Sequence, residues 1–569
     1  MSEVSPSDDV LDPQSLGGLT ERAAWSVVFL GVLIIGVNFA GGWTQDPIAV
    51  LVSPVLIVTG IAGMVWTWNA PATSMGRLRL GGFLISACAA LTPAAIETHA
   101  RHWFSTDSAA LNQLAGEALV RGHNPYTASM TAVDLLLKNP SRFYTYLASG
   151  GHVTHISYPP GSFLLVAPFQ ALGFHHATAD WVDLAAWGIA VLAIYLMLPG
   201  RIRFLAPMLL LFAGFTGAFT SGGTDALFLP FLVVAVWRWD DLGSGRTVGW
   251  HRWVGPVALG LACSIKQGPW FFVPFLVAGT AIEARAAGRS WIRLTASYLG
   301  ATIGVFAVVN LPFLVADPGA WFDGTTLPFR LPLVADGSGV VALALHGLTG
   351  GAVMPWLTMA GLLMVVALLV AFVLWYPATK RIWLFALPLA LGLPGRSLAN
   401  YFVNYFPIAI VAAVCVHVAP SSGLPVPRRS LRVLAVAAPL TACLAAIVVG
   451  LTSAPLEINV AQVKTIDHTR AFRRLTITVH NTSSGHLAPR FFVDTNGGHP
   501  DGYWQATPAS GSWPIPAGAT STLILTPRGY ASTPDPGHYW IVDAYTTGPE
   551  ALSTSRLMKW PDDGHDRRS

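Results

Sequence analysis

Asp107 is the residue whose place in the sequence best suits proton chemistry. It stands at the start of a predicted helix in which apolar side chains recur at helical spacing, namely Leu111, Leu114 and Ala118. This pattern predicts an amphipathic helix that lies on the membrane surface. A carboxylate there could take a proton from the hydroxyl group of a membrane-bound substrate. A structural role is the alternative, because the helix dipole favours an acid in the first turn.

Basic residues inside or beside apolar segments are a second group with chemical potential. Lys266 interrupts a long apolar run, where an ion is expensive and is therefore a functional candidate. Arg396 lies at a break between two apolar segments, and Arg330 lies in a polar loop. Because arginine forks match the geometry of phosphate, these residues could hold a phosphate group. Snorkelling to lipid headgroups is the alternative for each of them.

Three further polar residues could face a substrate. Asp225 begins an apolar segment and could bind hydroxyl groups, or it could belong to a helix N-cap. His155 is the candidate among five histidines whose spacings match no zinc site, so no metal is expected. Asn400 shares a predicted polar helix face with neighbouring tyrosines, and this face could line a cavity or anchor the helix at the interface.

The composition shows what kind of scaffold must position these residues. The chain has 569 residues, of which 53% are hydrophobic and 11% are charged, against about 25% charged in a typical soluble domain. A polytopic integral membrane protein is therefore expected. The net charge of +4 is small and scattered, which argues against a nucleic-acid partner. All four cysteines lie in apolar segments, so no extracellular disulfide is expected.

Long apolar runs predict about 11–13 transmembrane helices, since a bilayer core needs about 20 apolar residues per helix. The candidate spans are 24–40, 48–66, 78–96, 158–172, 181–198, 204–219, 226–237, 254–280 (with a possible break at Lys266), 294–315, 354–376, 382–393, 401–418 and 431–451. Several of these are short, which favours tilted or broken helices.

Basic clusters predict the sidedness of the chain by the positive-inside rule. Those at 77–79, 285–293, 380–381 and 428–432 should be cytoplasmic, which puts loops 97–157 and 316–340 and the C-terminal region outside. The basic residues of 201–203 and 238–252 conflict with a simple crossing count. Either 158–172 is re-entrant or 254–280 is miscounted. We expect a multi-pass protein of the plasma (inner) membrane.

The C-terminal region predicts a small β-sandwich. The stretch 475–479 alternates apolar and polar residues, and short runs at 491–493, 521–525 and 539–543 are separated by turn residues. The expected domains are a disordered cytoplasmic tail (1–20), a transmembrane domain (21–451), an extracytoplasmic β-sandwich (452–562) and a short tail (563–569). Tyr503, Trp504, Trp513 and Trp540 could form a sugar-stacking platform or pack in the sandwich core.

Five motifs in this order carry a resemblance to a known superfamily. They are Asp107 followed by Leu119-x-x-Gly-x-Asn-Pro-Tyr126, then Tyr158-Pro-Pro-Gly, Thr224-Asp225, Ser264-Ile-Lys-Gln-Gly-Pro269 and Arg396-Ser-Leu-Ala-Asn-Tyr-Phe402. Together they resemble the GT-C membrane glycosyltransferases, and more narrowly the actinobacterial polyprenol-phosphate-mannose-dependent mannosyltransferases. The resemblance covers about residues 78–418 and leaves out the first two spans and the β domain.

The resemblance implies an inverting sugar transfer, with mannose as the sugar, from a polyprenyl-phosphate donor to a lipid-linked or polysaccharide acceptor outside the membrane. It implies an acidic base in the first outer loop, where Asp107 matches and Glu97 and Glu117 are the alternatives. Donor phosphate contacts are expected from Lys266, Arg330 and Arg396. Substrate contacts are expected from Asn124, Tyr126, His155, Tyr158, Asp225 and Asn400. No cofactor and no metal are expected.

Three other functions stay open at this level. Arabinofuranose could replace mannose as the transferred sugar. A multi-span transporter or lipid flippase would also have many spans and few charges, although no inverted internal repeat is visible. A non-catalytic envelope-assembly protein could use its β domain to bind partners.

Overall fold

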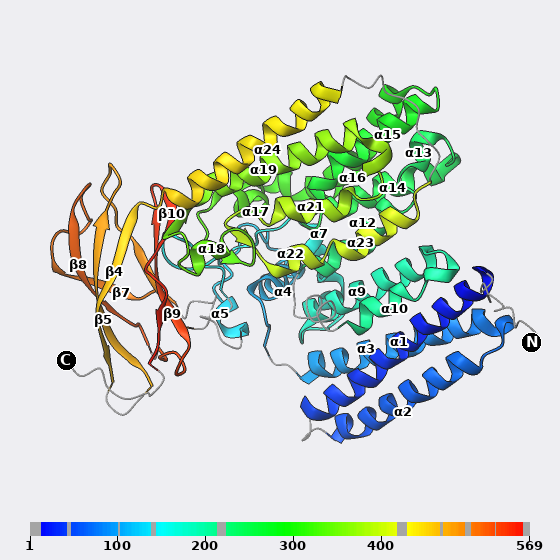
Figure 1. Ribbon diagram of the computed structural model, residues 1–569, viewed down its shortest axis with the longest axis horizontal. Coiled ribbons are helices and arrows are strands. Elements are labelled where there is room, and N and C mark those ends of the chain that lie inside the picture. The colour runs from blue at the N-terminus through cyan, green and yellow to red at the C-terminus, as the bar shows by residue number, and fades with distance from the viewer. Residues whose placement is uncertain are drawn as a thin grey trace, which may run out of the picture.

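The computed structural model describes residues 13–42, 47–100, 103–137, 144–212, 224–417, 429–466, 470–495, 502–529 and 531–561. These residues form a bundle of helices with a β-rich domain at one end, while the N-terminus lies at the other end (Figure 1). Most of the expected N-terminal tail, 1–12, lies outside the described residues, as do 563–569. Residues 13–20 were expected to be disordered but form the first turns of a helix.

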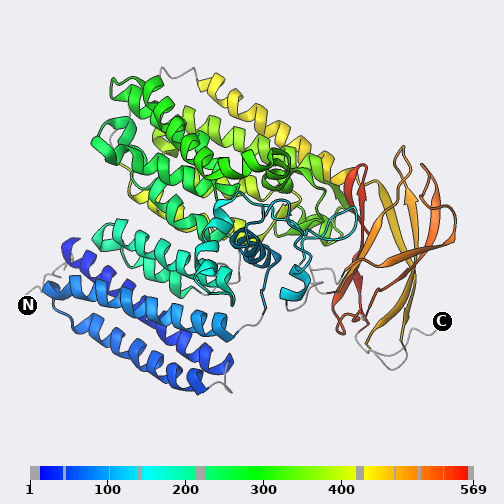
Figure 2. The ribbon, with the colours of Figure 1, turned by 180° about the vertical axis from the view of Figure 1, so that it is seen from behind.

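Seven helices of the described residues are long and apolar enough to cross a membrane. They are α1 (Pro13–Gly42), α2 (Pro47–Asn69), α3 (Met75–Ala100), α9 (Thr178–Met197), α16 (Trp291–Ala316), α19 (Met354–Leu374) and α24 (Arg429–Thr452). Seen from either side, α1–α3 form one flank of the bundle and α24 runs along the opposite flank (Figures 1 and 2). The expected polytopic helical membrane fold is confirmed.

Other expected spans are shorter helices. They are α7 (Gly161–Leu164), α8 (Ala167–Ala171), α10 (Leu205–Leu211), α12 (Asp225–Val236), α14 (Val254–Cys263), α15 (Val273–Ala286), α21 (Trp383–Leu391) and α23 (Phe406–Val414). At 1.5 Å per residue, the 10 residues of α14 extend about 15 Å, roughly half of a hydrocarbon core. The break expected at Lys266 is present between α14 and α15. Part of the expected span 204–219 lies outside the described residues.

The short helices bear on the crossing count. Segment 158–172 forms α7 and α8, helices of 4 and 5 residues, and each is too short to cross a bilayer by itself. The basic stretches 238–252 and 285–293 meet at one end of the bundle, where Arg289 donates to the carbonyl oxygens of Leu242 and Gly243 at 2.6 and 3.1 Å. In Figure 1 this end, marked by α13 (Asp241–Ser244), is the one opposite the β domain.

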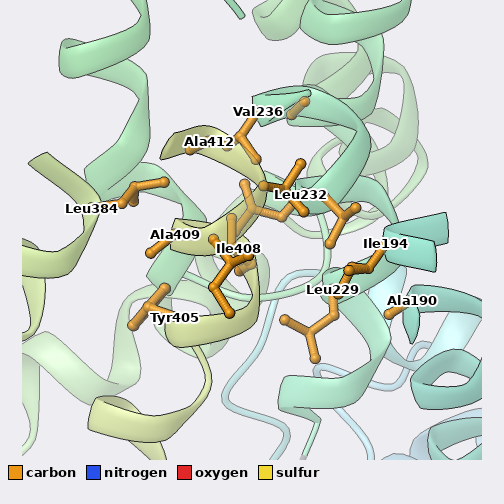
Figure 3. Close-up of a cluster of buried hydrophobic side chains, with 14 of the residues drawn as sticks. Ala190, Ile194, Leu229, Leu232, Val236, Leu384, Tyr405, Ile408, Ala409 and Ala412 are labelled. Carbon is orange, nitrogen blue, oxygen red and sulfur yellow. The ribbon is translucent and has the colours of Figure 1, made fainter. Parts of the chain in front are cut away.

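The core of the bundle is packed where α9, α12 and α23 meet. Figure 3 shows side chains from these helices interdigitating: Ala190, Ile194, Leu229, Leu232, Val236, Ile408, Ala409 and Ala412. All of them are almost fully buried. Lipid is as apolar as these side chains, so close packing, aided by the small alanines, must hold the helices together.

Two sheets form the C-terminal domain and enclose a common apolar core. The first has the order β4 (Leu456–Thr465), β5 (Phe472–Asn481), β8 (Thr520–Thr526), β7 (Gln505–Ser510). The second has the order β11 (Met558–Lys559), β9 (Tyr539–Thr547), β10 (Glu550–Thr554), β2 (Gly351–Val353), with β6 (Arg490–Asp494) also on β9. The expected sandwich is confirmed. Tyr503, Trp504 and Trp540 are buried and therefore form no stacking platform, whereas Trp513 is 37% exposed.

One strand of the second sheet comes from the membrane domain. β2 directly precedes α19 and pairs antiparallel with β10, with Val353 opposite Ala551 and Gly351 opposite Ser553. Gly351 approaches β10 so closely that the Cβ of any other residue would clash with the Leu552 carbonyl oxygen. The β domain is thus hydrogen-bonded into the bundle and is not a separate appendage.

Candidate active site

Asp107 begins a helix that lies inside the protein. Helix α4 (Asp107–Val120) has Thr106 as its N-cap, whose hydroxyl accepts a hydrogen bond from the Ala109 amide. Both apolar and polar side chains of α4 are buried, among them Ala110, Leu111, Asn112 and Gln113. The expected position on the membrane surface is therefore wrong, because the polar residues of α4 find partners within the protein instead of in water. Gln113, for example, donates to the His175 carbonyl oxygen at 3.0 Å.

The carboxylate of Asp107 is half-buried and fixed by one hydrogen bond. Its Oδ2 accepts from the Thr145 amide at 2.7 Å. Among the described residues, its other oxygen has no partner. A carboxylate oriented at one oxygen and open at the other can accept a proton from a hydroxyl group placed beside it.

Glu97 and Glu117 are less suited to the role of base. Glu117 accepts from Gln113 at 3.0 Å through one oxygen and from Arg121 at 3.1 Å through the other, so both of its oxygens are engaged. Glu97 lies near the end of α3 and is partly buried.

The start of α4 lies against the start of α12. The Ser108 hydroxyl donates to the Thr224 hydroxyl at 3.4 Å, and Thr224 directly precedes Asp225. The two expected acids, far apart in the sequence, therefore lie in one region of the fold.

Asp225 is the centre of a buried polar cluster built by three segments of the chain. Its Oδ1 lies 2.6 Å from Lys266 Nζ, and its Oδ2 accepts from the Asn400 amide. Lys266 stands at the break between α14 and α15, and Asn400 lies in the short helix α22 (Ala399–Val403). The side chains of Asp225 and Lys266 are only 4% and 13% exposed. An ion inside a membrane domain needs such a partner, so each of these two charges makes the other tolerable.

Two aromatic rings flank the ammonium group of Lys266. Its Nζ lies 5.3 Å from the ring centre of Tyr158 and 6.0 Å from that of Tyr401. Both distances are within the range of cation–π attraction. The two rings cover part of the Lys266 side chain, which stays 13% exposed.

A set of backbone contacts fixes Tyr158 beside Lys266. The Tyr126 hydroxyl donates to the Tyr158 carbonyl oxygen at 2.8 Å, and the Gly161 amide donates to the Ser264 carbonyl oxygen at 2.8 Å. A Cβ on Gly161 would lie 2.6 Å from that oxygen, so the Tyr-Pro-Pro-Gly motif needs its glycine for this approach. The motif therefore docks the loop that precedes α7 onto the helix break.

Gln267 ties a third segment to the same place. Its amide nitrogen donates to the carbonyl oxygens of Ser157 at 2.9 Å and of Thr325 at 2.7 Å. Thr325 belongs to α17 (Pro318–Arg330), so this one buried side chain joins the outer loop, the helix break and α17. Sequence patterns gave no reason to single out Gln267.

The remaining loop candidates lie around the cluster. Tyr126 is 5% exposed, packs edge-on against Phe163 and Phe313, and supports Tyr158 from below. Asn124 accepts from the Tyr126 amide and shapes the turn after α4. His155 is exposed.

The two candidate arginines differ in position. Arg396, in β3 (Arg396–Ser397), is 20% exposed, lies 3.7 Å from Asp336, and interacts electrostatically with Tyr401. Arg330 ends α17, is 52% exposed and pairs with Asp323. Arg396 is thus a neighbour of the cluster, whereas Arg330 is placed apart from it.

Asp183 is a candidate site residue that sequence reasoning missed. It lies on α9, is 2% exposed, and interacts electrostatically with Asp225 and Lys266. Its Oδ1 is buried without a hydrogen-bond partner in the described part of the chain. The signal in the sequence was an acidic residue inside an apolar segment. Because burying a charge there is energetically costly, such a residue is a candidate for a functional role.

Residues 156–394 match the model of glycosyltransferase family 87. The matched segment holds Tyr158, Asp225 and Lys266 and ends just before Arg396. It contains neither Asp107 nor the β domain. The match, over less than half of the chain, supports glycosyl transfer as the class of reaction. No curated protein and no solved structure matches the chain.

A second charged group lies at the other end of the bundle and has the composition of a metal site. Ligand atoms of Asp240, Asp241 and His417 lie within 4.8 Å of one another. Lys380, however, lies 3.0 Å from Asp240, and Arg246 lies 3.7 and 3.8 Å from Asp240 and Asp241. These cations already neutralise the carboxylates, so the group fits an ion network better than a cation site.

Proposed function

We propose that the protein transfers a sugar, mannose in the first instance, from a polyprenyl-phosphate donor to a hydroxyl group of a lipid-linked or polysaccharide acceptor. The observation that carries the proposal is the half-buried carboxylate of Asp107, open at one oxygen, beside the buried cluster of Asp225, Lys266 and Asn400. The family match over residues 156–394 supports sugar transfer as the reaction class.

Asp107 acts as the general base. Its open oxygen takes the proton of the acceptor hydroxyl as the acceptor oxygen attacks the anomeric carbon. The bond from that carbon to the phosphate oxygen breaks, and polyprenyl phosphate leaves with the bonding electrons. One direct displacement inverts the anomeric configuration, and the proton stays on Asp107 until the product departs.

Lys266 and Arg396 stabilise the leaving phosphate. An ammonium group has three donors, and Asp225 engages one of those on Lys266. Its remaining donors, together with the guanidinium of Arg396, can hold the charge that develops as the phosphate departs. Two fixed positive groups therefore supply the stabilisation that this leaving group needs.

Polar groups near Lys266 bind the sugar. Asp183 has an unsatisfied acceptor oxygen close to Asp225 and Lys266, and a sugar hydroxyl is a suitable donor for it. Asn400 and the two flanking tyrosines offer further polar and aromatic contacts.

The lipid tail of the donor can reach the site from the side. An apolar groove of about 360 Å³ runs between α3 and α9 and is lined by Leu91, Trp181, Leu184, Gly188, Ile189 and Leu192. The lining residues are all apolar or glycine, and this is the place that we propose for the polyprenyl tail.

The reaction takes place on the extracytoplasmic side of the plasma membrane. The basic stretches meet at the end of the bundle opposite the β domain, and such stretches favour the cytoplasm. The β domain and the loop that holds Asp107 then lie outside.

The test compares Asp107→Asn with the wild type in lipid nanodiscs. Both proteins are incubated with radiolabelled polyprenyl-phosphate mannose and an envelope-lipid extract, and label is followed by thin-layer chromatography. We expect the wild type to label a new species and Asp107→Asn to lose about 10²- to 10⁴-fold in rate. Glu117→Gln, on the same helix, is the matched control and should stay active.

Each other outcome changes the proposal in a defined way. Equal transfer by wild type and Asp107→Asn would remove Asp107 as the base. Transfer from the arabinose donor alone would replace mannose with arabinofuranose. Transport of an intact donor across the bilayer, with no transfer from either donor, would overturn the transferase.

A further inference from the structure

We infer that the β domain positions the general base, and that Tyr503 is the positioning residue through which it acts. This inference rests on the proposed function, because it takes Asp107 as the base. Tyr503 touches no reacting group itself. It holds the loop whose backbone holds Asp107.

The first link joins Asp107 to the loop segment 144–148. The Thr145 amide donates to Asp107 Oδ2 at 2.7 Å. Within the described residues this is the hydrogen bond that fixes the carboxylate. The direction of its open oxygen therefore depends on where the backbone of this loop lies.

The second link joins the loop to the β domain. The Tyr503 hydroxyl donates to the Leu147 carbonyl oxygen, two residues after Thr145. The ring of Tyr146 meets Phe492 and Tyr503 edge-on, with ring centres 5.3 and 5.5 Å apart. All three rings are buried, so the loop is held by one hydrogen bond and by a closed aromatic contact.

A second loop braces the first from the other side. The Val334 amide donates to the Tyr146 carbonyl oxygen at 2.9 Å, and the Ala148 amide donates to that of Pro332 at 2.7 Å. This bracing loop leads to β1 (Asp336–Gly337), which pairs in parallel with the β3 strand that carries Arg396. The loop that hydrogen-bonds to Asp107 and the loop that leads to the strand pairing with Arg396 are therefore neighbours.

The bracing loop also contacts the β domain through a tyrosine. The Tyr545 hydroxyl donates to the Ala335 carbonyl oxygen at 3.4 Å. Two tyrosines of the sandwich, Tyr503 and Tyr545, therefore each hold a backbone carbonyl of one of the two loops. These contacts lie at the loop that holds Asp107 and at the loop packed against it, so the β domain is attached where it can position the base.

The kinetic consequence follows from the geometry. Loss of the Tyr503 hydroxyl should leave the proposed substrate-binding cluster around Lys266 intact, because Tyr503 contacts Leu147, Tyr146 and Phe492 and, within the described part of the chain, no residue of that cluster. It loosens the loop that aims Asp107, and misplacement of a reacting group by about 1 Å can cost about 10²-fold in rate. The value of kcat should fall while the KM for donor and acceptor stays the same.

The experiment uses the full chain in nanodiscs and compares Tyr503→Phe with the wild type. We expect kcat to fall about 10- to 100-fold, with both KM values within about twofold. Hydrogen–deuterium exchange of peptides that contain Thr145 should speed up in the variant. Tyr539→Phe is the matched control, because Tyr539 lies in the same domain but is 56% exposed, and it should change neither quantity.

The outcomes separate this inference from the proposed function. Unchanged kcat in Tyr503→Phe, in a preparation where Asp107→Asn has lost transfer, overturns the positioning role alone. A raised KM with unchanged kcat also overturns it and points to a substrate-binding role of the domain. If the wild type transfers no sugar, the proposed function falls, and unchanged exchange at Thr145 would then show that Tyr503 does not hold the loop. Should Tyr503→Phe fail to fold, Phe492→Leu loosens the same contact and is read in the same way.

Discussion

Two buried charge clusters lie in this helical bundle, and they differ in how completely their charges are paired. In the cluster nearer the β domain, Lys266 pairs with one carboxylate, that of Asp225. Its other N–H donors are engaged by no carboxylate of the described residues, and its side chain is 13% exposed. In the cluster at the opposite end, Lys380 lies between two carboxylates, 3.0 Å from Asp240 and 2.5 Å from Glu283. Both clusters contain ions where ions are costly.

Further partners surround the opposite-end cluster, although Asp240 Oδ1 has no hydrogen-bond partner in the described part of the chain. The Tyr376 hydroxyl donates to Glu283 at 2.8 Å, and the His417 amide donates to Asp240 at 3.1 Å. Arg246 adds a second cation beside Asp240. These groups come from the ends of several helices and tie those ends together.

We infer from this comparison that a buried lysine is suited to chemistry when it keeps donors that no carboxylate engages. Lys266 stands at a helix break beside two aromatic rings, an unsatisfied Asp183 oxygen and the base helix. Lys380 is paired with two carboxylates, those of Asp240 and Glu283. Removal of the first lysine should therefore abolish chemistry, whereas removal of the second should loosen the fold.

The largest effect is expected at Lys266. Lys266→Met removes the charge that faces the leaving phosphate and should lower kcat at least about 10²-fold. It also leaves Asp225 as an unpaired buried charge, which costs about 3–5 kcal/mol of stability. The measurements are the transfer assay and the thermal unfolding of the protein in nanodiscs.

A double variant separates these two effects. Asp225→Asn combined with Lys266→Met removes both charges and leaves an amide that can still accept from Asn400. Stability should return towards that of the wild type while transfer stays lost. Recovery of transfer in the double variant would show that Lys266 serves only to neutralise Asp225.

A stability effect without a loss of chemistry is expected at Lys380. Lys380→Met leaves Asp240 and Glu283 to face each other without their shared cation, which costs about 3–5 kcal/mol. The rate per folded molecule should stay near that of the wild type. Arg330→Met, which removes an exposed cation, is the matched control and should change stability by less than about 1 kcal/mol. A large drop in kcat for folded Lys380→Met would contradict the division between the two clusters.

Sequence patterns could predict the elements that follow from composition. Apolar runs marked the long helices, and alternation marked strands such as β5, because burial acts on each segment separately. The cost of a buried ion marked Lys266 as a site residue. The same argument would have marked Asp183, but only its contact with Asp225 and Lys266 separates it from an acid at a span end.

Other features depend on contacts between distant segments, which no local pattern carries. The interior position of α4 was missed because its polar residues looked solvent-facing, whereas Gln113 bonds to a backbone carbonyl from a later segment. The division of 158–172 into two short helices was missed because an apolar run of that length fits either one span or a broken segment. The strand β2 was missed because it has three residues and its partner lies in another domain.

The smallest effect is expected at a third buried charge, which has no cation beside it. Asp543 lies in β9, is 4% exposed, and forms no ion pair with any described residue. Burial raises the pKa of the Asp543 carboxyl well above its usual range, and the nearby Asp494 raises the pKa further.

The sign of its effect on stability follows from proton binding. The folded domain holds the Asp543 proton more tightly than the unfolded chain, whose carboxyl ionises near pH 4. Folding stability should therefore decrease as pH rises above about 4 and level off above the folded-state pKa. Asp543→Asn cannot ionise and should flatten this slope. At pH 8 its melting temperature should exceed that of the wild type by about 4–8 °C, the shift that about 1 kcal/mol gives in a domain of this size.

Asp535→Asn is the matched control for this last comparison. Asp535 is exposed and pairs with Arg470 on the surface of the same domain, and an exposed pair adds little to stability. Unfolding followed by hydrogen exchange of β9 peptides, from pH 5 to pH 8, should show a slope in the wild type and in Asp535→Asn but not in Asp543→Asn. A slope that survives in Asp543→Asn would show that Asp543 is not the group whose proton uptake sets the pH dependence of stability.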